Sequence, residues 1–341
     1  AAVVSIATAV DQVSKSLQTF AQFDDQLRVA ASYAGATAEE FQAMGRAAAE
    51  AGATTSKTAS QAAQGLAEFA SRGFSVREQI EALVPAIRLA EAAQVELGRA
   101  TEVSSGILRG YGKDVSELKR INDIIVGISG ASAANLNFVG EAAKFAIPAA
   151  RAVGEEFETV AAILGTLADQ QFEAGQSGNA LKNFLISLTG PTSKAQAALD
   201  KLGVSTRDAQ GNFLGLVPIF KQLNAANLDL TDSTAIFGRY FTTAALAVTK
   251  SIGEVEKDLD LLKYGIDGIT ESTAEFQQAG LGGSFRRLES AVEAIYVAVG
   301  DQLAPIVSAA AGLLTEFAGS SSKAAAATTV FAGAATVSYT H

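Results

Sequence analysis

The chain has 341 residues, of which 48% are hydrophobic and 18% are charged, and its formal net charge is −10. It contains neither Cys nor Trp, and its one His is the last residue, His341. This composition excludes a disulfide scaffold, a structural zinc site and a catalytic pair built on His or Cys within the fold. Because no Lys/Arg-rich run is present, it also argues against tight, sequence-independent DNA binding, and we expect no specific nucleic-acid partner.

Small residues dominate the composition, and only 5 residues are proline. This favours closely packed helices, so we predict a mainly α protein. We expect three segments: a long coiled-coil-like helix at 1–34, a multi-helix globular core at 35–250 and a helical C-terminal segment at 251–341. One small β-hairpin is predicted near 203–215. Since the chain begins with Ala rather than Met, we expect a fragment or a processed product.

The first 34 residues contain neither Gly nor Pro. Their apolar residues recur at alternating steps of three and four, on a broad face flanked by Ala and Ser, which suits three or more helices around a shared axis. We therefore predict a parallel homo-oligomer, a trimer, through Val3, Ile6, Val10, Val13, Leu17, Phe20 and Leu27. The alternative that this helix packs on its own domain stays open.

Beyond Gly35, helices of ten to twenty residues follow one another, separated by Gly, Pro and capping signals. Capping boxes are predicted at 37–40, 75–78 and 193–196, each with Ser or Thr followed three residues later by Glu or Gln. Segment 203–218 breaks the helical pattern. There, Gly211 and Asn212 have the left-handed tolerance that a hairpin turn requires, which is the basis of the predicted β-hairpin.

The stretch FEAGQSGNALKNFLISLTGPTSKAQ, residues 172–196, places two glycines three apart before an apolar helix. A phosphate-binding P-loop requires Lys and Ser/Thr at the helix start, but Gly178 is followed by Asn179 and Ala180. The dinucleotide fingerprint fails as well, because its first glycine and a preceding strand are missing. We interpret the stretch as a helix junction, in which Gly175 ends one helix and Gly178-Asn179 begins the next.

Paired carboxylates occur at Asp24-Asp25, Glu39-Glu40 and Glu155-Glu156. Adjacent helical residues point about 100° apart, so these pairs are better placed to complement a helix N-terminus or to face water than to share a substrate. No G-x-S-x-G elbow is present. We therefore predict no catalytic, cofactor-binding or metal-binding residue, no cofactor and no enzymatic activity.

Near the C-terminus, Phe285, Leu288, Val292, Ile295 and Val299 again step by three and four. We predict a helix from about Ser284 to Val299 and a second helix from about Pro305. No stretch reaches the roughly 18 consecutive apolar residues of a membrane span, so none is expected.

Several blocks in a fixed order carry a family resemblance. They are ASQAAQGLAEFASRGFS, then ALVPAIRLAEAAQVELGRATEVSSGILRGYG, then the long block from INDIIVGISG to LDKLGV that includes residues 172–196, then DAQGNFLGLVPIFKQL and IFGRYFTTAALAV. Together they make the region from about Ser60 to Thr249 resemble the core domain of phage tail tape measure proteins. One departure is Gln170-Gln171, where a more glycine-like turn is usual. The downstream stretch LGGSFRRLESAVEAIYVAVGDQLAPIVSAAAGLLTEFAG also resembles the segment that follows this core.

The resemblance implies a structural protein that occupies the lumen of the tail tube, determines tail length during assembly and assists genome ejection across the host envelope. It implies as partners the tail tube protein, tail tip or baseplate hub proteins, tail assembly chaperones and, during ejection, the host membrane. Its location would be the tail tube of the virion, and the host cytoplasm during assembly. A fully helical chain of this length would span about 510 Å, so Gly and Pro indicate the globular module with the end of an upstream coiled coil rather than the ruler itself.

Two other functions stay open. The Ala-rich region 303–337 could insert as amphipathic hairpins, which would make the chain a membrane-active, pore-forming helical protein, although it lacks a Lys/Arg-rich face. A tail-borne peptidoglycan hydrolase is the second alternative. It would require a zinc-binding His set, a Cys–His pair or a well-placed Glu in a cleft.

Overall fold

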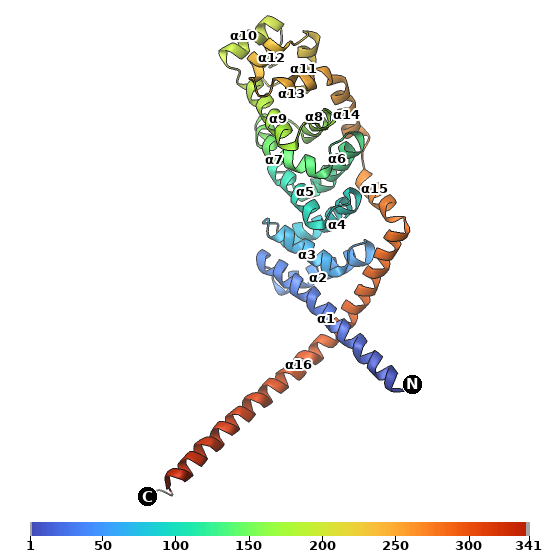
Figure 1. Cartoon of the computed structure of the whole chain (residues 1–341), viewed down its shortest axis with the longest axis vertical. Coiled ribbons are helices and arrows are strands. Elements are labelled where there is room, and N and C mark those ends of the chain that lie inside the picture. The colour runs from blue at the N-terminus through green and yellow to red at the C-terminus, as the bar shows by residue number, and fades with distance from the viewer. Residues whose placement is uncertain (1, 339–341) are drawn as a thin grey trace. The chain divides into compact units, whose positions relative to one another are not determined.

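A computed structural model of the chain describes residues 2–338, with side chains for residues 11–312 and 315 (Figure 1). Within these residues the secondary structure consists of sixteen α-helices and one 3₁₀ turn, and no strand is present. The prediction of a mainly α protein is confirmed. The chain divides into two compact units: a smaller unit, Ala1–Asp25 with Ala291–His341, and a larger unit, Gln26–Ser290.

The helices have short connections, as the capping and glycine signals of the sequence require. Their bounds are α1 Ala2–Ala34, α2 Ala38–Thr54, α3 Ala59–Ala70, α4 Val76–Ala93, α5 Leu97–Tyr111, η1 Val115–Glu117, α6 Leu118–Ala131, α7 Leu136–Val153, α8 Phe157–Asp169, α9 Ala174–Thr189, α10 Ser193–Leu202, α11 Leu216–Ala225, α12 Leu230–Phe237, α13 Thr242–Lys250, α14 Ile252–Tyr264, α15 Ile269–Gln278 and α16 Leu281–Ser338. The first part of α16, up to Ser290, belongs to the larger unit and the remainder to the smaller unit.

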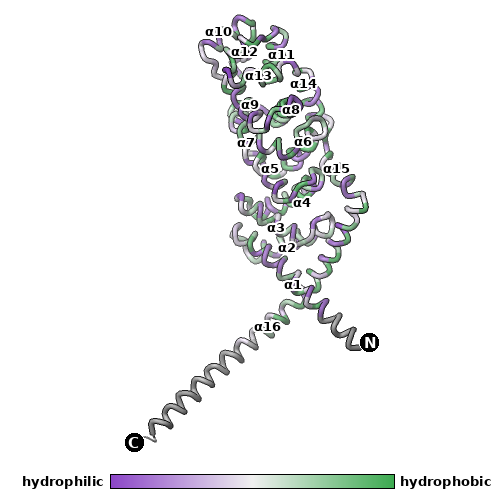
Figure 2. The backbone as a smooth tube through the Cα atoms, viewed as in Figure 1, coloured by the Kyte–Doolittle hydropathy of each residue, from purple (hydrophilic) through white to green (hydrophobic). Residues whose placement is uncertain are grey.

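In the larger unit, helices α2 to α9 follow one another along the unit in approximate chain order, and α10 to α13 group at its far end, where α13 packs back on α8 (Figure 1). The main pairs are α2 with α3, α5 with α7, α7 with α9 and α6 with α8, and most of these helices mix hydrophobic and hydrophilic residues, as a half-buried helix does (Figure 2). Helices α14 and α15 then return along the stack, because α14 packs on α8 and α6 and α15 packs on α6 and α4. We call α14–α15 the return helices.

Helix starts follow the predicted capping signals at two of three places. Thr37 and Ser75 each accept a hydrogen bond from the amide three residues on, at 3.3 and 3.4 Å, and the Glu at that position binds back. The box predicted at 193–196 is wrong by one residue: Thr192 is the N-cap and accepts from the Ala195 amide at 3.2 Å. Ser193 already lies inside the helix, so its hydroxyl cannot take the capping position.

The predicted β-hairpin near 203–215 is wrong. The segment contains one isolated antiparallel bridge, between Arg207 and Phe213, and no strand. The Asp208 carboxylate accepts hydrogen bonds from the Gln210 and Asn212 amides at 2.9 and 2.8 Å. Because this side chain takes up the amides beside the bridge, the backbone forms a tight loop in place of a ladder.

The predicted break between Val299 and Pro305 is also wrong, because α16 runs without interruption from Leu281 to Ser338 and contains Pro305. Proline removes one backbone donor, and the apolar helix-forming residues on both sides continue the helix past it. Within the described residues, the part of α16 from Leu281 to Gly312 is long and apolar enough to cross a membrane by length and composition. Ser308, Asp301 and other polar residues interrupt its apolar run, so the expectation of no membrane span, which required an unbroken run, did not include it.

The glycine pair of residues 172–196 does not form the helix junction that we predicted. Helix α8 ends at Asp169, the turn lies at Gln170-Gln171, and Gln171 takes a left-handed backbone with φ of 62°. Gly175 and Gly178 both lie inside α9. A Cβ on Gly178 would lie 2.2 Å from the carbonyl oxygen of Ala142 in α7, so this glycine lets two helix backbones touch.

Candidate interaction surfaces

The predicted interface residues of α1 lie in different surroundings. Val3, Ile6 and Val10 are helical, and their side chains lie outside the described residues. Val13 is 43% exposed, and Leu17 and Phe20 are half-buried. Leu27 is only 3% exposed, and its Cδ2 lies 3.2 Å from where a Cβ on Gly45 of α2 would be. The chain itself therefore covers Leu27, and the oligomer interface on α1 stays a prediction.

In the smaller unit, α1 crosses α16 at a glycine. A Cβ on Gly300 would lie 2.4 Å from the Cβ of Phe20 and 2.5 Å from the carbonyl oxygen of Ser16. Nearby, the Tyr296 hydroxyl donates to the Gln12 side chain at 3.0 Å. The face of α16 that meets α1 is thus built around a small residue, which permits close approach of the two helices.

A groove of about 520 Å³ lies between α5 and α7 in the larger unit. Its floor is apolar and includes Val103, Ile107 and Ile147. The space beside Gly106 is open, since a Cβ at this residue would meet no atom within 4 Å. Arg72, Arg109 and Lys144 are its cationic lining residues. An apolar floor with a charged rim fits an apolar side chain or helix better than a phosphate.

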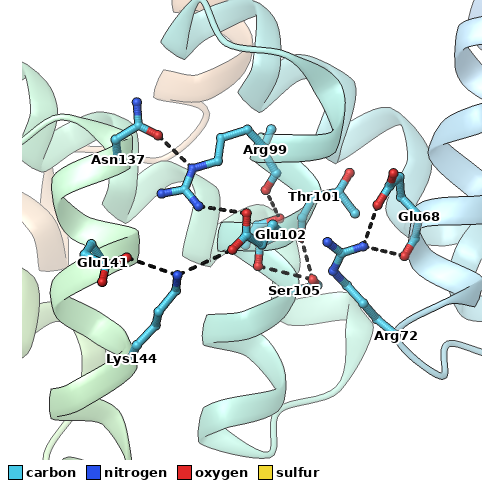
Figure 3. A network of polar contacts seen from close by, with 11 residues as sticks. Glu68, Arg72, Arg99, Thr101, Glu102, Ser105, Asn137, Glu141 and Lys144 are labelled. Atoms are coloured by element: carbon cyan, nitrogen blue, oxygen red, sulfur yellow. Dashed lines mark hydrogen bonds and ion pairs between the residues drawn. The ribbon is translucent and has the colours of Figure 1, made fainter.

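The polar network of Figure 3 contributes Arg72, Glu102, Ser105 and Lys144 to the lining of this groove. Lys144 pairs with Glu141 at 3.0 Å and with Glu102 at 3.5 Å, and Glu102 also binds Arg99 at 2.7 Å. The Arg99 hydrogen bond is the main cause that holds the pKa of Glu102 below its usual value. Glu102 is therefore ionised at neutral pH and joins α5 to α7, which does not suit a general acid.

The other two rim cations have partners of their own. Arg72 binds Glu68 at 2.8 Å, one helical turn away (Figure 3). Arg109 pairs with Glu78 at 3.0 Å and lies over the ring of Phe74 at 4.1 Å, a cation–π contact. The rim thus ties α5 to α4 and to the turn after α3.

A buried carboxylate that the sequence analysis did not single out joins α6 to the return helices. Asp123 is 1% exposed and accepts hydrogen bonds from the Gly268 and Thr270 amides, both at 3.0 Å, at the start of α15. One turn earlier, Arg120 donates to the carbonyl oxygen of Leu262 at 2.5 Å, near the end of α14. The α14–α15 turn is therefore held at both ends by α6. We call Arg120 and Asp123 the α6 clamp.

The paired carboxylates serve helix starts or face solvent, as predicted for Glu39-Glu40 and Glu155-Glu156. Glu39 and Glu40 lie in the first turn of α2. Glu155 accepts from the Leu216 amide at the start of α11, at 2.9 Å, while burial raises its pKa, and the exposed Glu156 pairs with Lys263 at 3.4 Å. Among the described residues, no group of three or more His, Cys, Asp or Glu could hold a metal ion.

The described residues thus form an all-helical protein. The charged side chains named above cap helices, form ion pairs or accept hydrogen bonds from neighbouring helices. Residues 45–244 match the family model of the phage-related minor tail proteins, and this span is more than half of the chain. The chain therefore belongs to the phage-related minor tail protein family.

Two curated relatives are tape measure proteins. The chain is 27% identical over 307 residues to the tape measure protein of Pneumococcus phage Dp-1, which covers 88% of this chain and 27% of that protein. It is 28% identical over 294 residues to the probable tape measure protein of Escherichia phage P2, with 83% of this chain and 36% of that protein covered. The chain thus spans about a third or less of the length of these relatives. No solved structure matches the chain.

Proposed function

We propose that this chain is part of a tape measure protein that lies in the lumen of a tail tube, determines tail length during assembly and assists genome ejection. The observation that carries the proposal is the similarity to the Dp-1 tape measure protein along 88% of the chain. The low share of charged residues and the absence of Cys support it, since a chain that is confined and later expelled benefits from weak adhesion and no cross-links. The role is structural, without catalysis.

The partners of such a chain would be the tail tube protein, tail tip or baseplate hub proteins, assembly chaperones and further copies of itself. A trimer through the predicted α1 interface is part of this proposal. The exposed Val13 supports it, whereas Leu27 would first have to leave α2.

Cryo-electron microscopy of tails from particles that carry this chain tests the location, and an insertion pair tests the length function. An extended helix adds 1.5 Å per residue, so inserting about four heptads into α16 should lengthen the tail by roughly 42 Å. The same number of residues inserted into the exposed turn at 208–212 should leave the tail length unchanged. A tube lumen without helical density, or equal tail lengths for both insertions, would refute the proposal.

A membrane-active, pore-forming protein is the second candidate, and one observation favours it: the length and apolar composition of α16 from Leu281 to Gly312. Leakage of dye from phosphatidylcholine vesicles measures this activity. Leakage caused by the full chain and lost when Ile295 and Ile306 are both replaced by Gln would support it. Equal leakage from both proteins would count against α16 as the active segment.

A further inference from the structure

We propose that the groove between α5 and α7 binds a helix of a partner protein that has one apolar face with carboxylates along its edges. We call this surface the α5–α7 groove. It has a volume of about 520 Å³, and α5, α7 and the turn after α3 supply its lining. This volume lies in the range of natural binding pockets. The proposal goes beyond the role in a phage tail and would stand if that role failed.

The floor of the α5–α7 groove has space that the chain does not fill. A Cβ on Gly110 would lie 2.8 Å from the side chain of Ile147, so this glycine lets α5 and α7 approach each other. A Cβ on Gly140 would lie 2.5 Å from the side chain of Val103, and this glycine has the same effect. Gly106 also lines the groove, but a Cβ on it would have no neighbour within 4 Å. The apolar floor beside Gly106 is therefore open to a side chain from outside.

The backbone around the groove determines which conformation an occupant can take. The lining residues of α5 and α7 lie within helices, so most of their N–H and C=O groups are bonded inside each helix. An exception is the carbonyl of Lys144, because Pro148 has no amide hydrogen to donate to it. An extended segment would therefore bury its own backbone groups without partners, whereas a helix pairs these groups internally. A helix that inserts an apolar face is thus the occupant that fits this surface.

The charges in the lining determine which partner helix fits. Three cations line the groove, Arg72, Arg109 and Lys144, against the single carboxylate of Glu102. The lining is thus cationic, whereas the chain as a whole has 26 Lys and Arg against 36 Asp and Glu. Opposite charges across an interface guide association and select the partner. Carboxylates along the edges of the partner helix would match this rim.

The rim cations have partners within the chain, but these pairs leave them accessible. Their partners include the carboxylates of Glu68, Glu78 and Glu141, none of which lines the groove. The side chains of Arg109 and Lys144 remain 43% and 52% exposed. Ion pairs at this exposure contribute little to stability, and a guanidinium has five N–H donors. A carboxylate of the partner can therefore share these cations without disturbing the fold.

A membrane surface and a second copy of the chain are the competing occupants. Helices that bind a membrane surface do so by burying an apolar face among the lipids. The apolar floor of the α5–α7 groove instead lies between two helices and is bordered by charged side chains. This shape favours a helix that enters the groove over a lipid surface. Sedimentation of the chain distinguishes a second copy from a partner protein.

Two synthetic peptides of about 20 residues, long enough to form a helix in water, test the recognition. Both carry Leu along one face, and the edges of this face carry Glu in the acidic peptide and Lys in the basic peptide. Fluorescence anisotropy of the labelled peptides measures their binding to the full chain. The net charge of −10 alone would favour the basic peptide, whereas the groove should bind the acidic peptide about tenfold more tightly. Equal affinities, tighter binding of the basic peptide, or no binding of the acidic peptide would overturn the proposal.

Variants of the full chain locate the binding in the groove. Gly106→Leu fills the open floor and should weaken binding of the acidic peptide by about tenfold. Gly130→Leu in α6 is the matched control, because a Cβ there also meets no atom within 4 Å and this residue does not line the groove. It should leave the affinity unchanged, and circular dichroism should show the same helix content in both variants. An affinity that Gly106→Leu does not lower would contradict the site.

Charge variants and sedimentation complete the test. Arg72→Gln with Lys144→Gln should weaken binding of the acidic peptide, whereas Lys119→Gln with Lys194→Gln, which removes the same charge from exposed residues outside the groove, should not. Equal effects of the two pairs would count against the cationic rim. Self-association of the unchanged chain that Gly106→Leu abolishes would identify a second copy as the occupant and overturn the proposal. Binding to phosphatidylglycerol vesicles that Gly106→Leu abolishes would overturn it in favour of a membrane.

Discussion

Replacing Gly178 with Ala should destabilise the larger unit, because the added methyl group has no space between α9 and α7. Its Cβ would lie 2.2 Å from the carbonyl oxygen of Ala142, whereas ordinary contacts begin at 3.4 Å, so α9 must retreat by about 1 Å. Overpacking of this kind costs up to about 3 kcal/mol, and the better helix propensity of Ala offsets about 1 kcal/mol. The net loss in the free energy of unfolding should be about 2 kcal/mol.

Thermal unfolding followed by far-UV circular dichroism measures this loss. For a unit of this size, 1 kcal/mol corresponds to about 2–4 °C, so the midpoint of Gly178→Ala should fall by roughly 4–8 °C. Gly175→Ala in the same helix is the matched control. Its Cβ would approach nothing closer than Phe145, at 3.9 Å, so its midpoint should stay the same or rise slightly. If Gly178→Ala melts at or above the midpoint of the unchanged chain, the close approach of α7 and α9 is refuted.

Three further predictions follow from single side chains. Asp123→Ala leaves two amides at the start of α15 without their buried acceptor. It should therefore lower the free energy of unfolding by about 2–4 kcal/mol and speed amide hydrogen exchange in residues 266–278. Unchanged exchange in these residues would refute the α6 clamp. Burial and the nearby Asp169 raise the pKa of Asp258 from 3.8 to about 6, so its contribution to stability is complete below pH 3.8 and is lost as the pH rises through 6. Asp258→Asn should therefore weaken the pH dependence of the unfolding midpoint between pH 3.8 and about 6. A midpoint that depends on pH as strongly in the variant as in the unchanged chain would contradict the raised pKa of Asp258. Thr192→Ala should lower the free energy of unfolding in urea by about 1 kcal/mol, and Ser193→Ala should leave it almost unchanged. A larger loss from Ser193→Ala than from Thr192→Ala would support the capping box that the sequence predicted.

The sequence predicted the helices well, because the information that sets them is local. The apolar stripe of α8, from Phe157 to Ala168, is buried as its spacing requires. Thr37 and Ser75 start helices because their hydroxyls reach an amide three residues on. Local patterns of this kind depend on neighbours within one turn, so they can be read without knowing the fold.

What the sequence could not show depends on residues far apart in the chain. A glycine such as Gly178 indicates that a side chain is not tolerated, but not whether a turn or a neighbouring helix is the cause. The cause here is Ala142, which lies in another helix. The turn itself falls on Gln171, whose positive φ no propensity predicts. In the same way, Asp123 lies in a helix that also carries Lys119 and Arg120, so nothing local marks it out, and its partners lie 145 and 147 residues away.

The position of these partners bears on how the larger unit holds together. Helices that stack in chain order make mostly neighbouring contacts, and such arrays can unfold from an end in pieces. The return helices change this, because α14 contacts α8 and α6 while α15 contacts α6 and α4. They therefore reinforce the direct contacts that α6 makes with α4 and α8, and the α6 clamp fixes the turn between α14 and α15 at Leu262 and Gly268. On this argument, loss of Asp123 should lower not only the stability of α15 but also the sharpness of the unfolding transition of the whole unit.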